Sequence, residues 1–229
     1  VKRRNGFLQP QFNNSESLGS SLYIPYFITS DQDKDITLKP TLFEKEKYIL
    51  QSEFRKQNKN SFLIADLALL RNYRALNDNK VRNVNHLFLD FVGDLKLDNY
   101  TKSGFEAQIE KVNNNTYLKV FQNVLTQSPV MPKSLTTMNS NLKFYFDKDN
   151  QNLSSGIEIY ENLGNKNSDR YQYTLPYYDF NKNLTSIFEE NSINGYLNFS
   201  SSGSNTLKDT NNLKTTIVNN LGYDSYNHI

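Results

Sequence analysis

The feature that most constrains this chain is a two-residue alternation of apolar and polar side chains, which recurs along most of its 229 residues. In residues 35–42 the even positions carry Ile, Leu, Pro and Leu, and the odd positions carry Asp, Thr, Lys and Thr. Successive side chains of a β-strand point to opposite faces, so the pattern predicts strands with one apolar and one polar face. Comparable runs occupy residues 47–57, 105–110, 142–147, 155–161, 170–180, 195–200 and 213–223.

Clusters of Asn, Asp, Ser and Gly separate these runs, for example at residues 147–152 and 200–204. These residue types tolerate tight backbone conformations, so the clusters predict turns. Residues 123–140 contain Pro129 and Pro132 and are predicted to form a loop. About ten to twelve strands joined in this way predict an all-β fold, an antiparallel up-and-down meander. Since no linker is evident, we expect one domain over residues 1–229.

The predicted strands are long enough to cross a membrane, because a tilted transmembrane strand needs about 9–11 residues. Only 37% of the residues are hydrophobic and no run of 18 apolar residues occurs, so no transmembrane helix is predicted. Charged residues stand in mid-strand, as the polar wall of a water-filled barrel allows. Tyrosines and phenylalanines gather near strand ends, as interfacial girdles do. The sequence therefore favours an incomplete transmembrane β-barrel, although a soluble sandwich would alternate in the same way.

Charge and residue types argue against several functional classes. The 26 basic and 24 acidic residues are interspersed, so no basic stripe for nucleic acid is present. Without cysteine and with two histidines, the chain is a poor candidate for a zinc site, a thiol nucleophile or a histidine-based triad. Residues 147–158 partly imitate a calcium loop, but Asn152 stands where such loops require Gly. We expect a protein that is not an enzyme and holds no cofactor or metal.

Four short motifs lie in order within the first 55 residues. They read R-R-N-G-F-L-Q-P at 3–10, L-Y-I-P-Y-F at 22–27, D-I-T-L-K-P at 35–40 and E-F-R at 53–55. Together they resemble the first four barrel strands of the LptD (OstA/Imp) family of lipopolysaccharide-assembly proteins in the Gram-negative outer membrane. Beyond residue 60 the resemblance depends mostly on the strand pattern.

The resemblance implies a concrete role. Members of that family have a periplasmic β-jelly-roll domain followed by a large C-terminal barrel, which encloses an LptE lipoprotein plug. Lipopolysaccharide arrives along a periplasmic bridge of Lpt proteins and leaves sideways, through a lateral gate between the first and last strands. This chain is then expected to be the N-terminal portion of the barrel domain, without the jelly roll and the closing strands, and to insert lipopolysaccharide into the outer leaflet.

Pro10 and Pro25 are the predicted lateral-gate residues. Proline has no N–H, so within a strand it removes a hydrogen bond of the ladder. A plainer interpretation is that Pro10 precedes the first strand and Pro25 ends the second; the resemblance favours the gate. Pro40 shares their spacing of fifteen residues and is given a structural role. The polar residues predicted to face the lumen are Lys39, Glu53, Arg55 and Glu106.

Two other functional classes stay open at this point. One is a soluble β-sandwich or β-helix that acts as a surface binding module, such as an adhesin. Another is an outer-membrane enzyme or porin of a different family. Extraction discriminates between the first class and a membrane barrel, because only the barrel should require detergent.

Overall fold

A computed structural model describes residues 3–15, 18–44, 47–73, 82–125, 128–165, 170–185, 195–208 and 212–225. The elements are β1 (Gly6–Phe7), β2 (Gln11–Ser15), β3 (Gly19–Tyr23), β4 (Tyr26–Thr29), β5 (Lys34–Phe43), β6 (Tyr48–Gln57), β7 (Ser61–Tyr73), β8 (Arg82–Asp94), β9 (Lys102–Val112), α1 (Tyr117–Phe121), β10 (Thr137–Lys148), β11 (Gln151–Asn162), β12 (Tyr171–Asn183), β13 (Gly195–Lys208) and β14 (Asn212–Ser225). Within these described ranges, no helix is long and apolar enough to cross a membrane.

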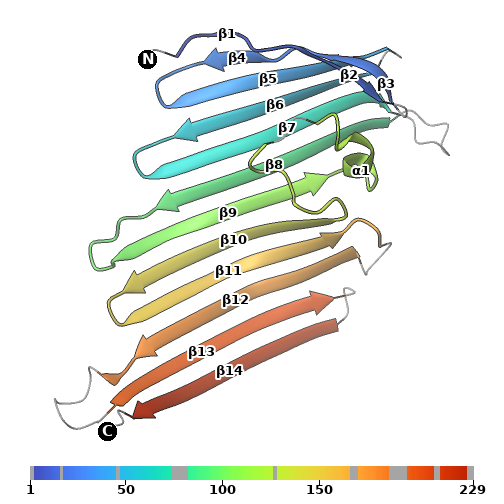
Figure 1. Cartoon of the computed structure of the whole chain (residues 1–229). Coiled ribbons are helices and arrows are strands. Elements are labelled where there is room, and N and C mark those ends of the chain that lie inside the picture. Colours follow the sequence, from blue (N-terminus) through green and yellow to red (C-terminus); the bar gives the residue numbers. More distant parts are fainter. Residues whose placement is uncertain are drawn as a thin grey trace. The chain divides into compact units, whose positions relative to one another are not determined.

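The strands form one sheet in which chain neighbours pair with each other. Its hydrogen-bonded order runs β1-β4-β5-β6-β7-β8-β9-β10-β11-β12-β13-β14, while β2 pairs with β3 and β3 also pairs with β5 (Figure 1). The order does not close on itself. The prediction of an antiparallel up-and-down meander, consistent with an incomplete barrel, is therefore confirmed. The strands do not divide into the two sheets that a sandwich requires.

The chain divides into two compact units, and each is described here by itself. The first comprises residues 1–91, 108–140 and 162–164, and the second comprises residues 92–107, 141–161 and 165–229. The first unit contains β1 to β7 and one end of β8, β9 and β10. The second contains the other ends of these strands, β12, β13, β14 and nearly all of β11.

Burial alternates along β5 and β6 of the first unit. Polar side chains are buried and apolar ones are exposed, which is the reverse of the arrangement in a soluble sheet. On β5 the polar residues Asp35, Thr37 and Lys39 are buried. By contrast, Leu42 is 51% exposed and Leu50 on β6 is 44% exposed. The alternation predicted for these strands is confirmed, and it is the polar face that the first unit covers.

The segment between β9 and β10 supplies part of that cover. Tyr117, Leu118 and Phe121 of α1, followed by Leu125, are spaced so that one side of a helical turn is apolar, and all four are buried. They pack with β7 and β8 residues such as Phe88 in a single apolar cluster. Figure 1 shows α1 and the segment after it lying over the sheet. A helix of five residues is not stable alone, so this packing is what holds it.

In the second unit, one predicted turn is confirmed and one is wrong. Residues 149–150 form the turn between β10 and β11, within the predicted 147–152. Residues 200–204, however, lie inside β13, where Ser200 pairs with Asn220 and Ser204 with Thr216. Gly203 fits there because the Tyr178 ring of β12 occupies the space that a Cβ atom would take. The cross-strand ladder and this aromatic cover outweigh the turn preference of Ser and Gly.

Candidate functional site

The first two strands of the sheet are interrupted at the same level, and the predicted gate residues lie at the interruption. Phe7 pairs with Tyr26 and Gln11 pairs with Tyr23, so three residues, 8–10, stand opposite two, 24–25. One strand thus carries an extra residue, which is a β-bulge. Pro10 is the last residue of the bulge before β2, and Pro25 lies between β3 and β4. Both are where the sequence predicted a weakened ladder; their role in a gate stays a prediction.

Two backbone contacts span the interruption. The Leu8 N–H donates to the Pro25 carbonyl at 2.9 Å, and the Ile24 N–H donates to the Pro40 carbonyl at 3.1 Å. In an antiparallel sheet such a residue pair normally exchanges two bonds, one in each direction. The return bond cannot form in either pair, because the residue that would donate it is proline. Each pair is therefore held by one bond.

Side chains of two residues just before β1 attach this part of the chain to β4 and β5. The Asn5 side-chain oxygen accepts the Thr29 N–H at 2.7 Å. The Arg3 guanidinium reaches past β4 to Asp35 on β5, with 2.8 Å between Nη1 and Oδ2. The residues before the bulge are thus tied to the sheet by polar side chains in addition to the two β1–β4 residue pairs.

Three of the predicted lumen residues meet in one ion-pair chain on β5 and β6. The Lys39 ammonium lies 2.8 Å from Glu53, and Arg55 donates its Nε–H to the other oxygen of Glu53 at 2.5 Å. The side chains of Lys39 and Glu53 are only 6% and 2% exposed, whereas Arg55 is half exposed. Three of the four short motifs, D-I-T-L-K-P, E-F-R and R-R-N-G-F-L-Q-P, therefore contact one another through Arg3–Asp35 and Lys39–Glu53.

Glu106, the fourth predicted lumen residue, belongs to the second unit. It is exposed on β9 and, with Lys102, Lys143 and Tyr145, lines a polar hollow of about 460 Å³. The orientation of all four predicted residues toward a lumen stays a prediction, since it depends on how a barrel closes.

A buried polar network that the sequence did not predict links the sheet to α1. Asp66 on β7 accepts hydrogen bonds from the Gln51 side chain at 2.9 and 3.1 Å and lies 3.0 Å from Nε2 of His86 on β8. Nδ1 of His86 lies 3.1 Å from the Tyr117 hydroxyl. His86 also stacks on Phe88, with 4.2 Å between ring centroids. All of these side chains are buried.

The carboxylate of Asp66 can only accept hydrogen bonds when it is ionised, and this limits which atoms of the network donate. An ionised Asp66 requires His86 to donate from Nε2, so Nδ1 of a neutral ring accepts the Tyr117 hydroxyl proton. Burial raises the pKa of the Tyr117 hydroxyl, and the nearby negative charge of Asp66 raises it further. Tyr117 therefore keeps its proton, and α1 is fixed to the sheet by a directional polar contact as well as by apolar packing.

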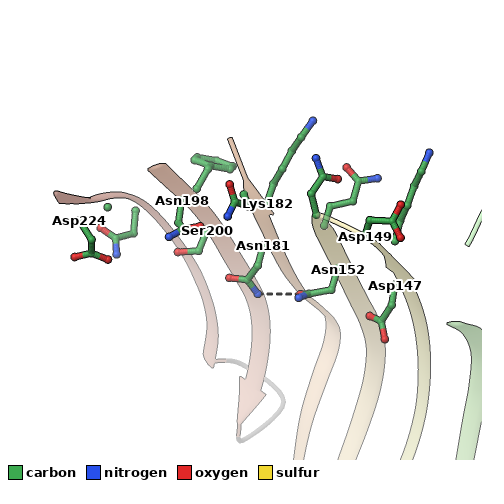
Figure 2. A pocket seen from close by; sticks show the side chains of 15 residues that line it. Asp147, Asp149, Asn152, Asn181, Lys182, Asn198, Ser200 and Asp224 are labelled. Atoms are coloured by element: carbon green, nitrogen blue, oxygen red, sulfur yellow. Dashed lines mark hydrogen bonds between the residues drawn. The ribbon is translucent and has the colours of Figure 1, made fainter. Parts of the chain in front are cut away.

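The second unit has a larger hollow at one end of β10 to β14, with a volume of about 610 Å³. Figure 2 shows amide, hydroxyl and charged side chains around it, including the 3.1 Å hydrogen bond from Asn181 to Asn152. Asn152, Asn181, Ser200 and Asn220 are register partners on four adjacent strands, so they form a cross-strand row. Such a surface can hydrogen-bond polar molecules.

Comparison with known proteins gives two partial similarities. Over 54 residues the chain is 43% identical to the LPS-assembly protein LptD of Paraburkholderia xenovorans (strain LB400). Over 60 residues it is 37% identical to the LPS-assembly protein LptD of Ectopseudomonas mendocina (strain ymp). The matched segments cover 24% and 26% of this chain and 7% and 6% of those proteins. No protein-family model matches the chain.

Proposed function

We propose that this chain is part of an outer-membrane translocon that inserts lipopolysaccharide into the outer leaflet, with its lateral gate beside Pro10 and Pro25. The partial similarity to two LPS-assembly proteins supports the pathway. The observation that carries the gate is the interruption of the first two strands at one level, with proline at both. The partners are then lipopolysaccharide, an LptE-like plug lipoprotein and the periplasmic Lpt bridge proteins of a Gram-negative cell.

The physical basis is the cost of opening a strand seam beside lipid. In hydrocarbon an unsatisfied backbone group costs several kcal/mol, so a ladder with its full set of bonds resists opening. A seam whose strands already lack donors has fewer bonds to break. The charged residues Lys39, Glu53, Arg55 and Glu106 then belong to the polar interior, where the saccharide part of the lipid is accommodated away from the acyl chains.

Replacing both gate prolines should slow lipid export in the full-length protein. Pro25→Ala restores a donor to the Leu8 carbonyl, and Pro10→Ala adds a donor to the outermost strand. Each new bond contributes about 0.5–1.5 kcal/mol, so opening should cost about 1–3 kcal/mol more and slow by about tenfold or more. Lipopolysaccharide should accumulate on the periplasmic side while barrel abundance stays normal. The readouts are surface lipopolysaccharide and sensitivity to bulky antibiotics.

The matched control is Pro129→Ala with Pro132→Ala, which adds two backbone donors in the segment before β10, outside every strand. This variant should export lipid at the parental rate. If the Pro10/Pro25 variant assembles at a normal level and also exports at the parental rate, the prolines only mark the ends of strands and the gate assignment is wrong.

A further inference from the structure

Pro40 removes a bond from the strand pair next to the one that Pro25 weakens. Ile24 donates to the Pro40 carbonyl at 3.1 Å, and no N–H returns from residue 40 to the Ile24 carbonyl. The β3–β5 and β4–β5 registers agree in placing Ile24 opposite Pro40. The one-bond pairs Leu8/Pro25 and Ile24/Pro40 therefore lie side by side and cross three strands at one level.

The weakened line stops at β5. Pro40 also pairs with Leu50 on β6, within a register of nine consecutive residue pairs. In an antiparallel sheet, a residue that directs its backbone groups to one neighbour turns them away from the other. Because residue 40 faces Ile24, its missing N–H costs the β5–β6 ladder nothing. The buried Lys39–Glu53 ion pair adds a side-chain tie between β5 and β6 at this position.

We infer that Pro40 is a third positioning residue of the gate, which makes β5 the fixed side of a hinge. Leu8 N–H to Pro25 and Ile24 N–H to Pro40 are the two pivots. The β1–β4 pair on one side of the line and the β2–β3 hairpin on the other can bend relative to each other about these pivots, whereas β5 runs through the line without a break in its pairing to β6. The inference rests on the proposed function, because it assigns the hinge to lipid export.

Hydrogen–deuterium exchange at residue resolution tests the hinge in the full-length protein in detergent. Pro40→Ala provides the N–H that returns to the Ile24 carbonyl, so exchange of the Ile24 amide should slow by about two- to tenfold. The backbone amide that this substitution creates at position 40 should itself be protected. The Leu22 amide, in the same β3–β5 pairing, should not change. Pro40→Val makes the same test with a residue that strands favour, should the alanine variant assemble poorly.

The functional arm measures surface lipopolysaccharide in the same variants, with Pro129→Ala as the control. Slower Ile24 exchange together with slower export supports the inference. Unchanged Ile24 exchange overturns it, and so does slower exchange with export at the parental rate. The Pro10/Pro25 variant separates the two proposals: if it exports normally the gate itself is wrong, whereas if it is slow and Pro40→Ala is not, only the third hinge residue is wrong.

Discussion

His86 connects Asp66 on β7 to Tyr117 on α1. Its two nitrogens contact Asp66 and Tyr117, and its ring stacks on Phe88. Because the ring is buried, losing either polar partner leaves a group that water cannot reach. The histidine thus serves as a connector between two strands and a helix.

His86→Phe should keep the aromatic stack and remove both polar contacts. Asp66 would then be a buried carboxylate with Gln51 as its remaining side-chain donor, and the Tyr117 hydroxyl would lose its acceptor. We expect a loss of about 2–4 kcal/mol in the free energy of unfolding, measured by guanidinium titration of the full-length protein in detergent. Tyr117→Phe should cost less, about 1–2 kcal/mol.

The double variant is the control for a direct contact. Once His86 is gone, removing the Tyr117 hydroxyl also removes an orphaned group, so the two costs should not add. Strict additivity of the two changes would contradict a shared hydrogen bond.

At this scale the sequence predicted some residues and not others, for a physical reason. The loss of a ladder hydrogen bond at proline can be predicted from the sequence, because the missing N–H belongs to the residue itself. Pro10 and Pro25 do lie at strand interruptions. Asp66 and His86 are 20 positions apart, and their meeting depends on register. A shift by one residue would turn either side chain to the other face, so the alternation alone could not show the contact.

Among the elements, β5 and β6 form the best-anchored strand pair near the interruption. Their cross-strand contacts include the buried Lys39–Glu53 pair at 2.8 Å. Strand β5 also offers a less buried counterpart, Lys34, which lies 3.6 Å from Asp31, the two side chains being 35% and 64% exposed. Comparison of the two separates burial from charge.

Lys39→Met should destabilise the protein and Lys34→Met should not. The first change leaves Glu53 buried with Arg55 as its remaining cationic partner and should cost about 1–3 kcal/mol. The second removes a surface pair worth about 0–1 kcal/mol. Denaturant unfolding of both variants under identical conditions provides the measurement. Equal effects would mean that the Lys39–Glu53 pair contributes no more than a solvated one.

The short helix α1 was missed because the sequence was searched mainly for the two-residue alternation of strands. Of the segment predicted as a loop, residues 123–140, the described residues 123–125 and 128–136 carry no strand, but the prediction is wrong for residues 137–140, which begin β10. The prediction also missed the helical spacing of Tyr117, Phe121 and Leu125, just before and at the start of this segment. That spacing was visible in the sequence. What it packs against was not, because no alternation was predicted for β7 and β8, whose covered face combines apolar residues such as Leu70 and Phe88 with the polar Asp66 and His86.

Over the whole molecule, the order of strands followed directly from the sequence, because each run pairs with its chain neighbour. The apolar face is left exposed. On β5, β6 and β7, whose other face is buried, Leu42, Leu50 and Leu67 are 51%, 44% and 45% exposed. Apolar surface of this extent is stable only against lipid, detergent or another protein.

The chain expressed by itself should therefore aggregate in water. We expect inclusion bodies without detergent, and a dispersed, strand-rich protein when a mild detergent is present during refolding. Circular dichroism and size-exclusion chromatography of the two preparations provide the comparison. A monomer that melts cooperatively at micromolar concentration without detergent would contradict the membrane interpretation.

The bulge at Leu8–Pro10 also affects which strands the sheet can accept. An open sheet edge is a template to which any extended segment can add, and natural proteins guard such edges with prolines and bulges. The β1–β2 edge carries both, whereas β14 has fourteen consecutive residue pairs with β13 and no proline. Strand addition is thus favoured at β14 and discouraged at β1–β2, so the sheet has a preferred direction of growth.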